Sequence, residues 1–396
     1  MAEILRLGVA GLGVATTQIF PFLADYPNLK VTAAADIRPD ALEVFKQRFG
    51  GRTYSSVEEM CTCPDVDVVY VCTPNHLHCP HVIAAAENKK HVIVEKPMAL
   101  TMEECERMNA AAERNGVHIL CGHTHSFDPP IRAMSEIVNS GKYGRLMMIH
   151  CWDYTDFMYR PRMAHELDTS RGGGVVFVQG PHHVDIVRQI AMRPLRRVSG
   201  ATGIWDPSRP TEGNYAAFLE FEDGASATVV YNGYGHFDTA ELHWWVGEGG
   251  EPRDPETNFK VRRNLRAVQD EAGLKESMRF AGAREGGFAH GAGEKIVRRQ
   301  QFFGLVLVSC EKADIRQSPD GLLIYDDEGK HEVALPHGAS SRAAELNEIY
   351  EAVVHNKPIF HNGRWGQATL EVCLAIYESA RNHRDVMLRY QQPSRH

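Results

Sequence analysis

Residues 4–13 read ILRLGVAGLG, a strand-like stretch that runs into a glycine turn. Its first half alternates apolar side chains as a β-strand does, and Gly11 and Gly13 then precede a helix-like stretch that starts at Val14. Glycine lets the backbone turn tightly and lets a pyrophosphate approach the amide groups at a helix N-terminus. The pattern predicts a dinucleotide-binding turn. Its third glycine is replaced by Thr16, which predicts slightly looser packing of the helix on the strand.

A second apolar stretch, residues 29–36, ends on an acidic residue. Asp36 is suited to accept hydrogen bonds from the adenosine ribose hydroxyls, which favours NAD over NADP. Arg38 leaves the choice open, because an arginine there could stack on adenine or bind a 2′-phosphate. The alternative interpretation is an incidental glycine turn in an α/β domain.

Strands and helices continue to alternate up to about residue 125. Thr101 and Glu104 form the capping-box signature of a helix that ends at Gly116. The further predicted strands are residues 66–74, 91–97 and 117–123. This alternation predicts a doubly wound parallel sheet, and we expect a nucleotide-binding domain at residues 1–125.

Ligands of such sheets bind outside the carboxyl ends of the strands, so polar residues there are candidates for cofactor binding. Glu95 and Lys96 end one strand and point to opposite faces, and Lys96 is suited to exchange a proton with a carbinol oxygen. A solvated lysine at a strand end is the alternative. The predicted cofactor-binding residues are Gly11, Gly13, Val14, Asp36, Arg38, Thr73, Pro74, Asn75, His78, Glu95, Lys96 and His123.

The stretches GVAGLG, VCTPNHLH and HVIVEKPMALT closely resemble those of the Gfo/Idh/MocA family, which includes glucose–fructose oxidoreductase and inositol dehydrogenase. The resemblance implies a Rossmann domain that binds NAD. It also implies that Lys96, in the Glu-Lys-Pro motif, lies beside the nicotinamide and takes part in proton transfer. A second domain is implied as well, with an open sheet that carries the substrate site and much of the subunit contact.

The second half changes character, and we expect an α+β domain at residues 126–396. Residues 145–157, 215–235 and 240–250 look like strands joined by hairpins, which predicts a predominantly antiparallel open sheet. The segment from about 252 to 295 is charged and rich in glycine, and predicts either an ordered arm or a loop.

Pro181 is suited to the first position of a helix, which places His182 on its first turn. The resemblance assigns His182 the acid–base role of the family's histidine. Val178 stands where many relatives carry an aspartate that orients this histidine, so its share of catalysis stays open. His183 competes for the role, although helical spacing turns it toward the packed side; a hydrogen-bonded structural histidine is the alternative for both.

Arg160 and Arg162 flank Pro161, and two guanidinium forks fit a carboxylated substrate. A solvated pair of loop arginines is the alternative. His125 and His165 are further candidates for substrate contact, together with His183. Histidines 123, 125 and 165 could also bind a metal, but nothing in the sequence shows that their loops converge, and we expect no metal site.

Several stretches resemble one branch of the family, the phthalate 4,5-cis-dihydrodiol dehydrogenases and related dehydrogenases of carboxylated dihydrodiols. They are residues 121–131, 159–162, 166–188, 308–325 and 363–381. The resemblance implies NAD-dependent oxidation of a carboxylated cis-dihydrodiol to a catechol. A sugar or inositol dehydrogenase is the alternative enzyme, and an NAD-binding sensor or scaffold without catalysis is the alternative of another class.

The composition of the chain indicates which classes of binding partner to expect. The 43 Lys and Arg against 51 Asp and Glu give a net charge of −8 without a basic tail, which argues against nucleic acid. Nine scattered cysteines predict reduced, mostly buried thiols. Without a signal-peptide pattern or an apolar run approaching about 18 residues, we expect a cytoplasmic enzyme of a small molecule, off the membrane. A sheet face in the second domain favours a homodimer or homotetramer.

Overall fold

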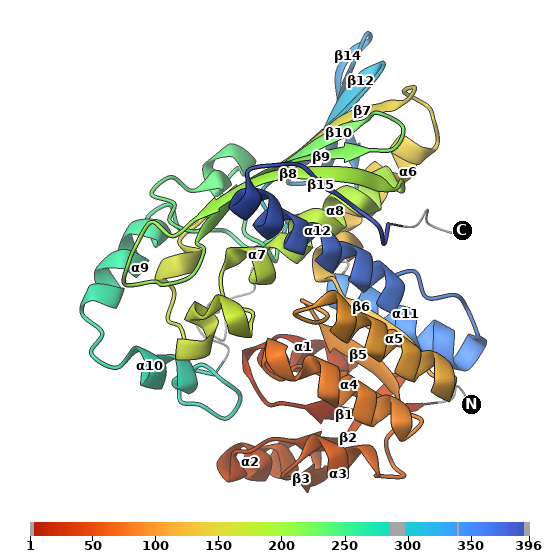
Figure 1. Cartoon of the computed structure of the whole chain (residues 1–396), viewed down its shortest axis with the longest axis vertical. Coiled ribbons are helices and arrows are strands. Elements are labelled where there is room, and N and C mark those ends of the chain that lie inside the picture. Colours follow the sequence, from red (N-terminus) through yellow and green to blue (C-terminus); the bar gives the residue numbers. More distant parts are fainter. Residues whose placement is uncertain (1–3, 286–297, 339, 392–396) are drawn as a thin grey trace. The chain divides into compact units, whose positions relative to one another are not determined.

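The structure is a computed structural model that describes residues 4–285, 298–338 and 340–391 (Figure 1). The described residues form two compact units, each with its own sheet. The first unit takes its described residues from Met1–Gly122, Asp270–Ala292 and Arg342–Leu370, and the second takes them from His123–Gln269, Gly293–Ser341 and Glu371–His396.

The sheet of the first unit has six parallel strands in the doubly wound order, as predicted. In spatial order they are β3 (Arg52–Tyr54), β2 (Leu29–Ala35), β1 (Leu5–Ala10), β4 (Val68–Val71), β5 (His91–Glu95) and β6 (Ile119–Gly122). The helices are α1 (Val14–Asp25), α2 (Pro39–Phe49), α3 (Val57–Cys61), α4 (His78–Glu87), α5 (Met102–Asn115), α10 (Glu271–Ser277), α11 (Ser341–His355) and the first turns of α12 (Gly363–Asn382). Figure 1 shows α4 and α5 side by side.

The capping box predicted for α5 is confirmed. Thr101 Oγ1 accepts from the Glu104 amide at 3.1 Å, and Glu104 Oε2 accepts from the Thr101 amide at 3.2 Å. Gly116 ends the helix with φ of +65°, a conformation that glycine adopts without strain.

The core of the first unit includes residues from late in the chain. Leu346 and Ile349 of α11 are fully buried and belong to the same apolar cluster as Leu7 of β1 and Ile93 of β5. A helix more than 200 residues beyond the sheet therefore completes the unit's core.

The second unit holds a nine-stranded sheet in which only β7 and β10 pair in parallel among the described strands, so the predicted antiparallel character is confirmed. The order is β14 (Gly329–Ala334), β13 (Gly321–Asp326), β12 (Ala313–Ser318), β11 (Leu305–Cys310), β7 (Leu146–Tyr154), β10 (Ser226–Asn232), β9 (Asn214–Phe221), β8 (Leu195–Gly203) and β15 (Val386–Met387). The helices of this part are α6 (Pro129–Asn139), α7 (Val175–Val178), α8 (Gly180–Ala191) and α9 (Thr257–Arg266), with 3-10 turns at Thr124–Phe127, Phe157–Tyr159, Ala164–Leu167, Thr169–Arg171 and Thr239–His243.

The strand predicted at residues 240–250 is wrong. Thr239–His243 is a 3-10 turn, because the Asp238 carboxylate accepts from the Ala240 amide and caps it. Trp244 then has φ of +59°, which no extended strand allows. Of the charged segment from 252 to 295, residues up to 285 are described and include α9 and α10; the rest lies outside the described residues.

One face of the larger sheet carries exposed side chains in the part of the chain that the structure describes. Helix α8 packs against the other face, as Figure 1 shows. On three neighbouring strands, His150, Thr228 and Phe218 pair in register and so lie on the same face of the sheet. Met148 and Trp152 lie two residues from His150 on β7 and therefore point to this face as well. Phe218, Met148 and Trp152 are each about 40% exposed, so apolar side chains gather on this face.

All nine cysteines are buried and free, which confirms the prediction of reduced, buried thiols. Within the described ranges, no helix is both long and apolar enough to cross a membrane.

Candidate active site

The glycine turn after β1 leaves room over the N-terminus of α1. Gly11 has φ of +92°, and a Cβ there would lie 3.0 Å from the Cys72 carbonyl oxygen, so the chain itself requires glycine. A Cβ on Gly13 would meet one chain atom within 4 Å, the same oxygen at 3.9 Å. The space beside Gly13, at the first turn of a helix that starts at Val14, therefore fits the pyrophosphate of a dinucleotide.

Thr16 replaces the third glycine without leaving its hydroxyl unsatisfied. The side chain is fully buried, and Oγ1 donates to the Gly11 carbonyl oxygen at 2.7 Å. The hydroxyl thus ties the helix to the glycine turn.

Asp36 and Arg38 form a fixed pair at the end of β2. Asp36 accepts from the Leu12 amide at 2.7 Å and from the Arg38 amide at 2.9 Å. The Arg38 guanidinium bonds Asp36 and the carbonyl oxygens of Leu12 and Phe280, and it lies 3.3 Å from Glu276. Because these acceptors engage Arg38, it is poorly placed to bind a 2′-phosphate, which supports NAD as the cofactor.

We expect Asp36→Asn to lower kcat/KM for NAD by about 10- to 100-fold, since hydrogen bonds to a charged group contribute about 1.5–3 kcal/mol. The ratio of NAD to NADP efficiency should fall with it, because repulsion of a 2′-phosphate by the carboxylate is lost. Initial rates with both cofactors measure this, with the exposed Asp40→Asn as the matched control. An unchanged ratio would contradict a role of Asp36 at the ribose.

His78 braces the ends of two strands. Its ring is fully buried, with Nδ1 2.9 Å from the Pro97 carbonyl oxygen and Nε2 2.9 Å from that of Thr73. Both ring nitrogens are thus engaged by backbone, which favours a positioning role; the cofactor contact of His78 stays a prediction. Pro74 and Asn75 open the turn that leads into α4, and their cofactor contacts stay predictions.

Glu95 is turned into a buried ionic cluster. It accepts from the Tyr70 hydroxyl, and its Oε1 lies 3.1 Å from Arg342. Arg342 also lies 2.9 Å from Glu345, whose side chain is fully buried. Tyr70 and Arg342 both bind the Glu95 carboxylate, which favours a bracing role; the cofactor contact of Glu95 stays a prediction.

The two carboxylates of this cluster differ in charge. Burial alone would raise the pKa of Glu95, but the Arg342 guanidinium and the Lys96 ammonium outweigh it and hold the pKa below its ordinary value. Burial raises the pKa of Glu345, more than Arg342 lowers it. The arrangement favours one ionised and one protonated carboxyl around a single guanidinium.

Lys96 follows Glu95 on the opposite side of the backbone and is half-buried. Pro97 comes next through a cis peptide bond, and its carbonyl is held by His78. The strand therefore ends with one charged side chain fixed in the interior and the other partly open to solvent. The role of Lys96 in proton transfer stays a prediction.

Three histidines of the second unit meet around one phenylalanine. The ring centroids of His125, His182 and His183 lie 4.4, 4.8 and 5.3 Å from that of Phe303. His182 lies on the first turn of α8 behind Pro181, as predicted, and is 7% exposed.

His183 belongs to the interior. It is fully buried, and its Nδ1 lies 2.8 Å from the Tyr215 hydroxyl. Burial is the larger cause, and the nearby His125 the smaller, that together lower the pKa of His183 to about 3. Burial and the contact with Tyr215 favour the structural alternative for His183, as its helical spacing does, and its substrate contact stays a prediction.

The two arginines are bound by carboxylates of the protein itself. Arg160 Nη2 lies 2.9 Å from Asp156, and Arg162 Nη1 lies 3.5 Å from Glu166, with its guanidinium 3.7 Å above the Phe157 ring. Arg162 is buried, whereas the Arg160 side chain is 30% exposed. Among the described residues, no acceptor bonds Arg160 Nη1, so Arg160 is the better placed of the two to bind a ligand.

His123 and His165 are the remaining histidines among the predicted site residues. His123 is 1% exposed, and its carbonyl accepts from the Ser126 hydroxyl at 2.8 Å. His165 lies on the 3-10 turn Ala164–Leu167. Their roles stay predictions.

Sequence reasoning missed three residues that shape these sites: Asp128, Phe303 and Arg342. Asp128 could have been found, because an aspartate before Pro129 is a helix-start signal. Phe303 and Arg342 carry no local signal, since only the fold brings them to their partners.

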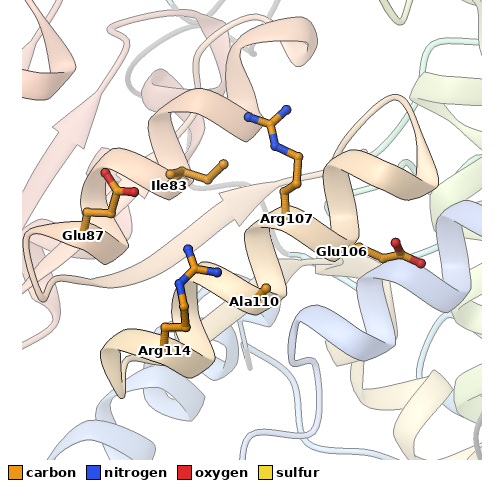
Figure 2. Close-up of a pocket in the computed structure, with 6 residues that line it drawn as sticks. All are labelled: Ile83, Glu87, Glu106, Arg107, Ala110 and Arg114. Carbon is orange, nitrogen blue, oxygen red and sulfur yellow. The ribbon is translucent and has the colours of Figure 1, made fainter.

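A shallow groove of about 350 Å³ lies between α4 and α5 of the first unit (Figure 2). Figure 2 shows the side chains of Arg107 and Arg114 on α5, with Glu87 on α4. Both arginines are exposed, and the lining includes none of the predicted site residues, so the groove is a solvated surface feature.

Comparison with known proteins shows the family of the chain. Residues 5–123 match the model of the Gfo/Idh/MocA oxidoreductase family with an NAD-binding Rossmann fold, and residues 131–250 match that of the Gfo/Idh/MocA C-terminal domain. The chain is 40% identical over 382 residues to the 1-carboxy-3-chloro-3,4-dihydroxycyclohexa-1,5-diene dehydrogenase of Comamonas testosteroni, covering 95% of each chain.

Two further proteins are similar to the chain, one over about half of its length and one over nearly all of it. The myo-inositol 2-dehydrogenase of Thermotoga maritima is 30% identical over 196 residues, which covers 49% of this chain and 57% of the relative. A crystal structure from Bordetella bronchiseptica RB50 is 41% identical with a TM-score of 0.90, and the match covers 98% of this chain and 100% of that one. The chain is therefore an NAD-binding oxidoreductase of the Gfo/Idh/MocA family.

Proposed function

We propose that the protein oxidises a cis-dihydrodiol bearing one or two ring carboxylates to the corresponding catechol. The observation that carries this proposal is the 40% identity, over 95% of both chains, to a dehydrogenase of a carboxylated dihydroxycyclohexadiene. The inositol dehydrogenase relative matches only about half of the chain, which gives the sugar or inositol alternative less support.

Lys96 is the proposed proton acceptor in this reaction. The hydroxyl O–H bond of the substrate breaks and its proton moves to the Lys96 amine, while a carbonyl forms at the carbinol carbon. Bound NAD supplies the acceptor for the hydride that leaves that carbon. The fixed Glu95 beside Lys96 holds the backbone of the motif in place through Tyr70 and Arg342.

Arg160 is the proposed partner of the substrate carboxylate. It keeps a donor nitrogen outside its ion pair with Asp156, and guanidinium groups bind carboxylates strongly. Arg162, bound to Glu166 and stacked on Phe157, supports the loop instead. His182 is retained as a proposed catalytic residue, which shares the proton transfer with Lys96 or binds a substrate hydroxyl. His165 is retained as a proposed substrate contact. The homodimer or homotetramer stays a prediction, with which the exposed apolar side chains on the face of the larger sheet agree.

The test is the initial rate of NAD reduction with carboxylated cis-dihydrodiols, uncarboxylated cis-dihydrodiols, inositol and glucose. We expect turnover of the carboxylated diols, and a loss of about 10- to 100-fold in kcat/KM for them in Arg160→Ala, because a charge-assisted hydrogen bond is removed. The effect on uncarboxylated diols should be small. Arg263→Ala, at an exposed arginine of the same unit, serves as the matched control.

Other outcomes separate the alternatives. Preferred turnover of inositol or glucose would show that the branch assignment is wrong and leave only the family-level dehydrogenase. Cofactor binding without turnover of any diol or polyol would favour the sensor or scaffold.

A further inference from the structure

We infer that His125, oriented by Asp128, is a second catalytic base, which takes the ring proton that must leave before the oxidised product becomes a catechol. The inference rests on the proposed function. It starts from an Asp–His pair that no sequence pattern indicated, in a chain where Val178 removes the carboxylate expected to orient His182.

The geometry of the pair is that of an oriented base. His125 Nδ1 lies 2.9 Å from Asp128 Oδ2, and Asp128 is only 1% exposed. The Ser341 hydroxyl donates to the other oxygen, Oδ1, so each carboxylate oxygen has a donor of its own. A buried carboxylate with both oxygens engaged holds the imidazole in one orientation and one tautomer.

The remaining ring nitrogen is the reactive one. With the proton of the neutral ring on Nδ1, Nε2 carries the lone pair. Among the described residues, Nε2 of His125 forms no hydrogen bond, and the side chain is 13% exposed, so the ring is mostly shielded from solvent. This is the state in which an imidazole accepts a proton from a bound molecule.

Packing fixes the ring further. The His125 ring stacks on Phe303 at a centroid distance of 4.4 Å. The His182 ring meets the His125 ring edge-on at a centroid distance of 4.8 Å. The titratable groups that face His125 are Asp128 from its own segment and His182 and His183 from α8. His183 is bound to Tyr215 in the interior, whereas His125 is oriented by the Asp128 carboxylate.

The reaction has a proton that Lys96 does not take. Oxidation of the first carbinol gives a ketone, with the hydroxyl proton already on Lys96. The neighbouring ring carbon still carries hydrogen: its C–H bond breaks, the proton goes to His125 Nε2, and the electron pair forms the ring C=C bond. The carbonyl π pair moves to oxygen, which takes the proton back from Lys96, and the catechol results. Atoms and charge balance, and no further oxidant is needed.

The test follows the two products separately in single-turnover reactions. NADH absorbance reports hydride transfer, and the absorbance of the catechol, checked by quenching and chromatography, reports aromatisation. In the wild type we expect both to rise together. In His125→Gln we expect NADH to form within about 3-fold of the wild-type rate, whereas catechol lags by about 100-fold, in the range of general base catalysis. Asp128→Asn should give a smaller lag of the same kind.

Controls keep the assignment falsifiable. His331→Asn removes the exposed histidine of a His–Asp pair between β14 and β13, with 4.0 Å between His331 and Asp326, and should show no lag. Imidazole added to His125→Ala should shorten the lag, which a purely structural role would not produce; thermal unfolding checks that each variant is folded.

Two outcomes would overturn the inference. One is catechol that keeps pace with NADH in His125→Gln, and the other is a loss of both signals in parallel in a folded variant without imidazole rescue. Absence of wild-type turnover on every carboxylated diol is a separate result, because it removes the proposed function itself.

Discussion

Replacing Lys96 with methionine is expected to lower kcat by about 10²- to 10⁴-fold, the usual contribution of a positioned acid–base group. The half-buried amine is the proposed acceptor of the hydroxyl proton, and methionine offers neither charge nor a basic nitrogen. NAD affinity, measured by fluorescence titration, should change by less than about 10-fold, because the glycine turn and Asp36 remain.

The variant Lys96→Arg distinguishes a role of the positive charge from a role of the basic amine. Lys96→Arg keeps the positive charge, but a guanidinium cannot lose its proton near neutral pH. We therefore expect Lys96→Arg to be as impaired in kcat as Lys96→Met. Lys46→Met, at an exposed lysine of α2, is the matched control. Recovery of more than a tenth of wild-type kcat in the arginine variant would show that Lys96 acts only as a charge.

Replacing Arg342 with methionine is expected to lower the free energy of unfolding by about 3–5 kcal/mol. Arg342 is the guanidinium shared by Glu95 and Glu345, and its removal leaves two buried carboxyls without a cation. Urea denaturation followed by circular dichroism measures the loss. Uptake of a proton by Glu95 should moderate it as the pH falls.

Two variants calibrate this expectation. Arg145→Met removes an exposed ion pair with Glu311, whose nitrogen and oxygen lie 2.8 Å apart, and should cost less than about 1 kcal/mol. Combining Arg342→Met with Glu95→Gln and Glu345→Gln should recover much of the loss, because no buried charge is then uncompensated. A triple variant no more stable than Arg342→Met alone would mean that shape, and not charge, makes Arg342 necessary.

The sequence was most informative where the signal is local. Strand periodicity, the glycine turn and the capping box of α5 predicted a doubly wound parallel sheet and five of its six strands; the short β3 was not predicted. The same reasoning failed at residues 240–250, because an apolar stretch resembles a strand while a capping aspartate and the positive φ of Trp244 impose a turn.

Local signals also made part of the candidate sites predictable. Lys96, Asp36 and His182 stand in recognisable motifs and could be named from the sequence. The residues that surround them could not, because only the fold brings those residues together. Nothing near Glu95 in the sequence indicates Arg342, and nothing near Arg160 identifies Asp156 as its partner in preference to the other acids of the region. The predicted boundary between residues 125 and 126 stays a prediction.

The helix α11 limits how this enzyme can exchange parts with its relatives. A chimera that keeps the first 125 residues and takes the remainder from another family member would also import that member's version of α11. The imported helix would have to supply an arginine for Glu95 and apolar side chains that fit Leu7 and Ile93. Substrate specificity therefore cannot be transplanted as a simple C-terminal half; a graft should retain residues 341–355 of the recipient.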